Sequence, residues 1–116
     1  MSTDSLVEDF RIAAMEKGEE GGSLDHHLHK RMCDAYAALM ALGPPGKTAF
    51  ESLLQDPSPT VRSWVAAQML ALGSKAALRV MRELSEQPGI AGFNASVTLS
   101  EYEAGRLKPP LTGAAA

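Results

Sequence analysis

The 116-residue sequence predicts an all-α protein of six helices, arranged as about three helical hairpins. Hydrophobic residues make up 45% of the chain but aromatic residues only 5%, so Ala, Leu and Met must supply most of the core, and these residues favour helices over sheets. No run of alternating β-branched residues indicates a strand. Two similar stretches, "LMALG" at 39–43 and "MLALG" at 69–73, each close a helix at glycine and indicate a repeated unit.

The first three helices are predicted from apolar spacing and from the residues that start and stop them. The first runs from about Asp4 to Lys17 and ends at "GEEGG". The second starts near Ser23 or Asp25 and ends at Gly43, where a left-handed C-cap precedes two prolines. The third begins in "PPGKT". The expected inward-facing residues of these helices are Leu6, Val7, Phe10, Ala13, Ala14, Leu28, Met32, Ala35, Tyr36, Leu39, Ala49, Phe50, Leu53 and Leu54.

The fourth helix has the clearest start in the chain, within "DPSPTVRSWVAAQMLALG" at 56–73. Ser58 precedes a proline and is therefore pushed out of the α region, as an N-cap residue must be. Pro59 then takes the first helical position, where its missing N–H does no harm. A broad face is expected to consist of Val61, Trp64, Val65, Gln68 and Leu72, with Ala66, Ala67 and Leu70 on the opposite side. A helix that is apolar on both faces is expected to pack against two neighbours at once.

Two more helices complete the domain. The fifth is predicted from Ser74 to about Glu86, and the sixth from about Ala91 to Ala104, with Gly105 as its cap. Their expected inward-facing residues are Ala77, Leu78, Met81 and Leu84, and then Phe93, Leu99 and Tyr102. We expect residues 1–110 to form a single domain and residues 111–116 a flexible C-terminal tail.

A seven-residue pattern in the fourth helix and its preceding turn resembles the inner-helix signature of HEAT-type repeats. The pattern consists of Asp56, Pro59, Val61, Arg62, Ala66, Ala67 and Leu70. The whole chain is also similar to a family of small bacterial proteins of unknown function with a HEAT-like fold, through "LVEDF", this pattern and "GFNASVTLSEYEAGRLKPP". The resemblance implies an α-α superhelix in which Asp56 and Arg62 bond with neighbouring repeats. We therefore expect Arg62 to tie two units together rather than to bind a ligand.

Composition excludes several classes of protein. The net charge is −3, from 11 basic and 14 acidic residues, and the absence of a basic block disfavours nucleic-acid binding. No apolar run approaches the roughly 18 residues of a membrane span, and "MSTDSLVEDF" lacks the features of a signal peptide. Because Cys33 is the only cysteine, it forms no internal disulfide, and we expect a cytoplasmic location.

His26, His29 and Cys33 are the candidate metal ligands, because spacings of three and four place them within one arc of the second helix, with Asp25 nearby. We favour a polar flank of a surface helix and predict no metal site, no cofactor and no catalytic residues, since no fourth ligand or acid–base pair is evident. "GPPGKT" lacks the first glycine of a phosphate loop and the preceding strand. Trp64 is expected to be a core residue rather than an exposed anchor for a partner.

The sequence points to a non-catalytic helical-repeat module that binds another protein through the surface of its inner helices, as a monomer or a homodimer. An immunity or antitoxin role is one form of this hypothesis, in which an acidic chain meets a basic toxin. The alternative is a nucleic-acid-binding HEAT-like protein, which would need basic residues gathered on the inner helices. An enzyme is a third possibility and rests only on the His-Cys cluster.

Overall fold

The computed structural model of the protein describes residues 2–17 and 26–112. These residues form six α-helices and one short 3₁₀ turn, so the predicted all-α class and helix number are confirmed for the described part of the chain. The elements are α1 (Thr3–Lys17), α2 (His26–Ala41), α3 (Pro44–Ser52), the 3₁₀ turn η2 (Leu53–Gln55), α4 (Pro59–Ala71), α5 (Lys75–Ser85) and α6 (Gly89–Glu103). The possible start of the second helix at Ser23 or Asp25 falls outside the described residues.

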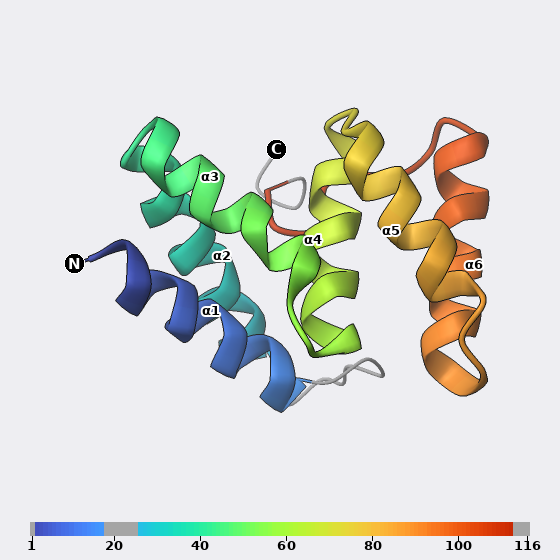
Figure 1. The fold of residues 1–116 in the computed structure, drawn as a ribbon, viewed down its shortest axis with the longest axis horizontal. Helices are drawn as coiled ribbons and strands as arrows, with labels where there is room; N and C mark the ends of the chain where they lie inside the picture. Colours follow the sequence, from blue (N-terminus) through green and yellow to red (C-terminus); the bar gives the residue numbers. More distant parts are fainter. Residues whose placement is uncertain (1, 18–25, 113–116) are drawn as a thin grey trace.

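The helices pack largely in chain order. Figure 1 shows the chain advancing from α1 and α2 on one side, through α3 and α4, to α5 and α6 on the other. Helix α3 packs against α1 and α2, α4 lies against α1 and α5, and α6 contacts both α5 and α4. After α6 the chain turns back and passes behind α4 in the view of Figure 1. This return places the end of the described chain against the middle helices.

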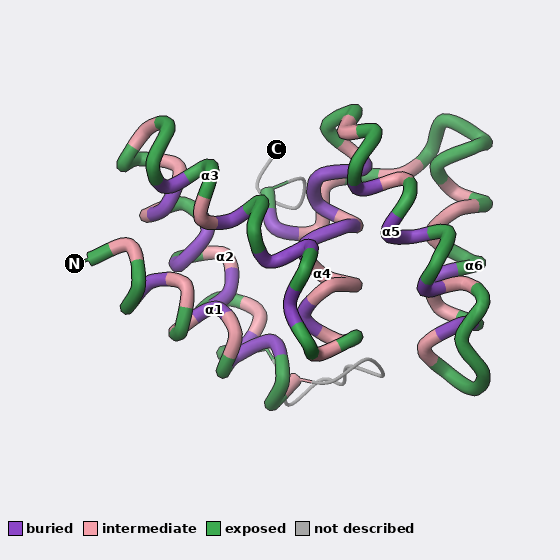
Figure 2. The backbone as a smooth tube through the Cα atoms, viewed as in Figure 1, coloured by how far each residue is buried: buried purple, intermediate pink, exposed green. Residues whose placement is uncertain are grey.

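The core is one cluster of buried side chains to which every helix contributes (Figure 2). Three aromatic rings from three helices meet near its centre: Phe50 of α3 lies edge-on to Phe10 of α1 at 5.3 Å and to Tyr36 of α2 at 4.8 Å between ring centroids. Such edge-to-face pairs stabilise beyond the apolar area they bury. The stripe predicted for α2 is buried at all five positions, and four of the five predicted for α1 are buried.

The helix starts and stops follow the predicted local signals. Ser58 has extended backbone angles and its hydroxyl accepts the Val61 N–H at 3.3 Å, so it is the N-cap of α4, with Pro59 in the first helical turn. Gly73 and Gly105 have positive φ values of 95° and 75°, which glycine adopts without strain. In both cases the chain beyond the glycine folds back to bond a carbonyl of the last turn.

The predicted inward face of α6 is wrong for two of its three residues. Phe93 is 68% exposed and Tyr102 is 36% exposed, whereas Gly92 and Ala95 are the buried residues of this helix. A side chain at Gly92 would lie 1.8 Å from the Gln87 carbonyl oxygen. The absence of side-chain bulk, and not hydrophobicity, therefore selects the face that α6 turns inward.

Asp56 joins two parts of the chain as the HEAT resemblance implies, but Arg62 does not. The Asp56 carboxylate accepts from Nε of Arg11 in α1 at 2.6 Å and from its Nη2 at 3.4 Å. It also accepts the Ser58 N–H at 3.0 Å. Arg62 donates instead to the carbonyls of Asp56 and Pro57, at 2.6 and 3.2 Å, within its own turn. Among the described residues, Arg11 thus supplies the inter-helix cation that we expected from Arg62.

The start of the expected flexible tail is packed. Leu111 is 4% exposed, and its N–H donates to Oε1 of Gln68 in α4 at 2.8 Å. The Gln68 amide also donates to the Thr112 hydroxyl at 3.1 Å. The folded part of the chain therefore reaches Thr112, and residues 113–116 lie outside the described residues. A fully buried glutamine needs such partners, because an unpaired buried amide is strongly unfavourable.

Candidate binding site

A hollow of about 310 Å³ lies between α4, α6 and the returning C-terminal segment. We call it the Trp64 hollow. Its lining residues are Ser63, Trp64, Ala67, Asn94, Val97, Thr98, Leu107, Lys108 and Pro110. Its volume is at the lower end of the range of small-ligand pockets, roughly 300–1,000 Å³. It is therefore sized for one or two side chains of a partner or for a compact ligand.

Three elements position the polar and aromatic groups of the hollow. Trp64 follows the proline-initiated start of α4 and lies half-buried, with part of its ring packed against the core cluster. Asn94 and Thr98 lie one turn apart on α6, where the Thr98 hydroxyl donates to the Asn94 backbone carbonyl at 3.0 Å. The hydrogen bond from the Leu111 N–H to the Gln68 side chain holds the segment that carries Lys108. The hollow therefore depends on residues far apart in the sequence.

The predicted core role of Trp64 describes only part of its environment. The ring of His29 from α2 lies 5.9 Å from the Trp64 ring, with an angle of 63° between the planes. The ammonium of Lys17 lies 5.8 Å from the same ring, within the range of a cation–π contact. Tryptophan is among the residues that most often carry the binding energy of protein interfaces.

The electrostatic character of the hollow is basic. None of its nine lining residues is a carboxylate, and Lys108 is among them. Burial lowers the pKa of His29, nearby Lys17 and His26 lower it further, and a hydrogen bond to the Pro110 backbone opposes them. His29 is therefore neutral at neutral pH, so the positive charge comes from the lysines. The hollow suits an apolar group accompanied by a carboxylate.

The three candidate metal ligands His26, His29 and Cys33 lie in different environments on α2. Within residues 2–17 and 26–112 no three His, Cys, Asp or Glu side chains are grouped as ligands would be. His26 is exposed, His29 faces Trp64, and Cys33 packs half-buried against the core. Burial raises the pKa of the Cys33 thiol, with Asp34 adding to the effect, which disfavours the thiolate that binds metals. Asp25 lies outside the described residues.

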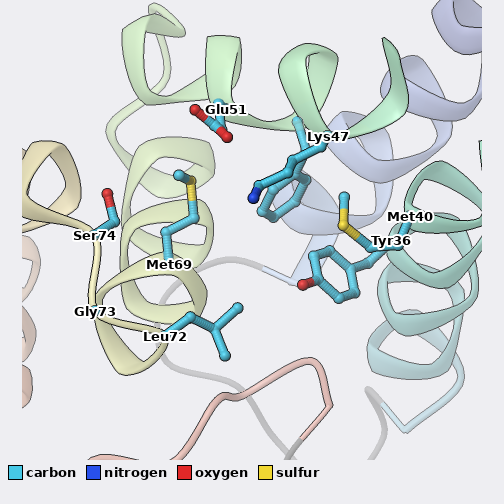
Figure 3. Close-up of a pocket in the computed structure, with 9 residues that line it drawn as sticks. Tyr36, Met40, Lys47, Glu51, Met69, Leu72, Gly73 and Ser74 are labelled. Carbon is cyan, nitrogen blue, oxygen red and sulfur yellow. The ribbon is translucent and has the colours of Figure 1, made fainter. Parts of the chain in front are cut away.

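A second cavity, of about 250 Å³, lies between α2 and α3 on one side and the end of α4 on the other (Figure 3). Its wall is apolar and rich in methionine, with Met40 and Met69 among the lining residues. Lys47 and Glu51, both from α3, also line it. Because this cavity carries charges of both signs, it has less electrostatic selectivity than the Trp64 hollow, and we favour the latter as the candidate site.

The HEAT-type pattern contributes mainly to the core. Most residues that line the Trp64 hollow were not predicted as site residues. Val61, Ala66 and Leu70 are buried in the core. Ala67 belongs both to the pattern and to the lining of the hollow. Asn94 and Lys108 were not singled out as site residues. Gln68, a polar residue on an apolar helix face, is a sequence signal for the C-terminal segment that carries Lys108, because its partners are Leu111 and Thr112.

Comparisons with protein-family models, with curated proteins and with solved structures find no match to this chain. These comparisons therefore identify no family for the chain, and the HEAT resemblance depends on the sequence pattern alone. In the part of the chain that the structure describes, no helix combines the length and apolar character that crossing a bilayer requires.

Proposed function

We propose that the protein is a non-catalytic, HEAT-like helical module that binds another protein through the Trp64 hollow. The observation that carries the proposal is a half-buried tryptophan in a basic hollow built from α4, α6 and the C-terminal segment. Interfaces concentrate their binding energy in a few residues, among which tryptophan is enriched, and the surrounding contacts exclude water.

The HEAT-like arrangement is supported by the chain-order packing of the helices. The bond between Asp56 and Arg11 adds to this support, because it links the turn before α4 to α1. Stacked helical pairs of this kind need neighbours to bury their apolar faces. In such stacks the surface of the inner helices is the usual binding surface, and α4 and α6 are the inner helices of our arrangement.

The local charge favours an acidic partner segment over a basic one. The net charge of −3 suggested a basic toxin as partner, but Lys108 lines the hollow and Lys17 lies beside Trp64. A partner segment with one large apolar side chain between Asp or Glu residues matches both features, since opposite charges steer association and fix register.

Nucleic-acid binding, the alternative, has weaker support. The basic residues Lys75, Arg79 and Arg82 line a groove on α5, but Glu83 and Glu86 line the same groove. Nucleic-acid surfaces need sustained positive charge along the phosphate backbone. The mixed charge of this groove provides no such surface.

Trp64 provides the test, because it is the only tryptophan in the chain. Titration with short acidic peptides that carry a central leucine should change the Trp64 fluorescence in a saturable way. Salt should weaken binding, since it screens the exposed lysines. Basic peptides of the same length and duplex DNA at low salt serve as the comparison ligands.

Each of two matched variants reverses the charge at one exposed lysine. Lys108→Glu should weaken peptide binding by roughly tenfold, in line with the electrostatic terms of close charge pairs. Lys75→Glu, on α5 away from the hollow, should leave it unchanged. Acidic peptides that produce no fluorescence change would refute the proposal, and tight duplex binding would replace it with the nucleic-acid alternative.

A further inference from the structure

The outward face of α6 carries three large apolar side chains in one stripe. Ile90, Phe93 and Val97 are 49%, 68% and 45% exposed, and their spacing of three and four residues aligns them on one side of the helix. Gly92 and Ala95 on the other side are buried, and most of α6 is otherwise exposed or intermediate (Figure 2). Scattered exposed apolar residues are ordinary, whereas a contiguous stripe marks an interaction surface.

The stripe carries no charge. From Ile90 to Ser100 the helix contains no Asp, Glu, Lys or Arg. The small residues Ser96 and Ser100 are exposed beside Phe93, so a neighbouring helix can approach closely. An uncharged surface has nothing that selects a charged partner, and two copies of it meet without like-charge repulsion.

The two ends of α6 are electrically opposite. At the start, the N-cap residue Pro88 provides no side-chain hydrogen bond to the first turn, so the free amide groups carry partial positive charge. Near the end lies Glu101, which forms an exposed ion pair with Arg106 at 3.1 Å. Glu101 follows Ile90 by about three helical turns, so it lies on the same side as the stripe.

We propose that the α6 stripe is the contact between two copies of this chain, packed antiparallel about a two-fold axis. In this arrangement Phe93 of one copy packs against Val97 of the other, and each Glu101 lies over the first turn of the opposite α6. A parallel arrangement would bring like ends together. Antiparallel pairing is therefore self-complementary in both apolar contact and charge.

The size of the stripe sets the strength of the dimer. A helix of 15 residues is about 22 Å long, and one face of it is smaller than the roughly 800 Å² per partner of a standard stable complex. We therefore expect a dissociation constant for the dimer that is micromolar or weaker. Ile90 and Phe93 do not line the Trp64 hollow, but Val97 does, so the dimer contact adjoins the hollow at Val97.

Sedimentation of the full chain from about 10 µM to about 1 mM tests the proposal over the affinity range expected for so small a contact. The wild type should pass from monomer to dimer across this range. Phe93→Glu should remain monomeric with an unchanged circular dichroism spectrum, because the side chain is largely exposed. Leu72→Glu is the matched control, since Leu72 is 62% exposed but lies at the end of α4, and it should dimerise as the wild type does.

A second pair of variants tests the antiparallel arrangement. Glu101→Lys should weaken the dimer by roughly fivefold, the size of a reversed charge–dipole interaction, whereas Glu103→Lys, two residues on and away from the stripe, should not. A wild type that stays monomeric to about 1 mM, or a dimer that survives Phe93→Glu, would overturn the contact. Equal effects of the two lysine variants would overturn the antiparallel orientation.

Discussion

Asp56 and Gln68 are the two buried polar side chains of residues 2–17 and 26–112, and each connects distant parts of the chain. Asp56 ties the turn before α4 to α1 through Arg11, and its hydrogen bond raises the pKa of the Arg11 guanidinium, so the cation is permanent. Gln68 ties α4 to residues 111–112. Buried polar groups of this kind specify which segments meet, because alternative packings would leave them unpaired.

The ion pair of Asp56 and Arg11 is expected to stabilise the fold measurably. Asp56→Asn keeps an oxygen for the Ser58 N–H but removes the charge that Arg11 faces, so we expect the free energy of unfolding to fall by about 1.5–3 kcal/mol. Glu8 is the other carboxylate partner of Arg11, and the Glu8 side chain is 56% exposed. Glu8→Gln should therefore change the free energy of unfolding by less than about 0.5 kcal/mol. Urea unfolding followed by circular dichroism measures both, and equal effects would contradict the prediction.

At the scale of the helix, close approach is decided by residues without side chains. Gly46 in the first turn of α3 is buried, and a Cβ there would lie 1.8 Å from the Leu39 carbonyl oxygen in α2. Gly92 plays the corresponding part in α6, opposite the Gln87 carbonyl. In both cases a methyl group would meet backbone, which cannot move aside as a flexible side chain can.

Gly46→Ala should therefore separate the end of α2 from the start of α3. We expect the free energy of unfolding to fall by roughly 2 kcal/mol or more, as in other overpacked sites. Thr48→Ala is the control on the same helix, because Thr48 is exposed, and it should stay within about 0.5 kcal/mol of the wild type. Thermal unfolding gives the comparison, and a Gly46→Ala variant as stable as Thr48→Ala would disprove the close contact.

At the scale of the whole molecule, the C-terminal segment, residues 105–112, completes the candidate site. Residues 105–112 return across α4 after α6 (Figure 1). Lys108 and Pro110 from this segment close the Trp64 hollow, and the Pro110 backbone opposes the lowering of the pKa of His29 in α2 by burial. The segment therefore packs against α4 and shapes the surface that we propose for binding.

Gln68→Leu should release this segment while α4 keeps its apolar packing. The amide of Leu111 should exchange with solvent roughly tenfold faster or more, because its buried acceptor is lost. Thr112→Ala removes only the weaker of the two contacts and should have a smaller effect. Hydrogen exchange resolved by residue measures the change, and protection of Leu111 that survives Gln68→Leu would show that other contacts hold the segment.

The sequence by itself determined the all-α class, the positions of the six helices in the described chain and most of the core. These follow from local rules: apolar spacing along one helix, the Ser58 cap and the glycines at the ends. The tertiary structure alone decided the buried face of α6, the pairing of Asp56 with Arg11 and the packing of Leu111. Each of these depends on which distant groups come within a few ångströms of each other, and no periodicity along a single helix contains that distance.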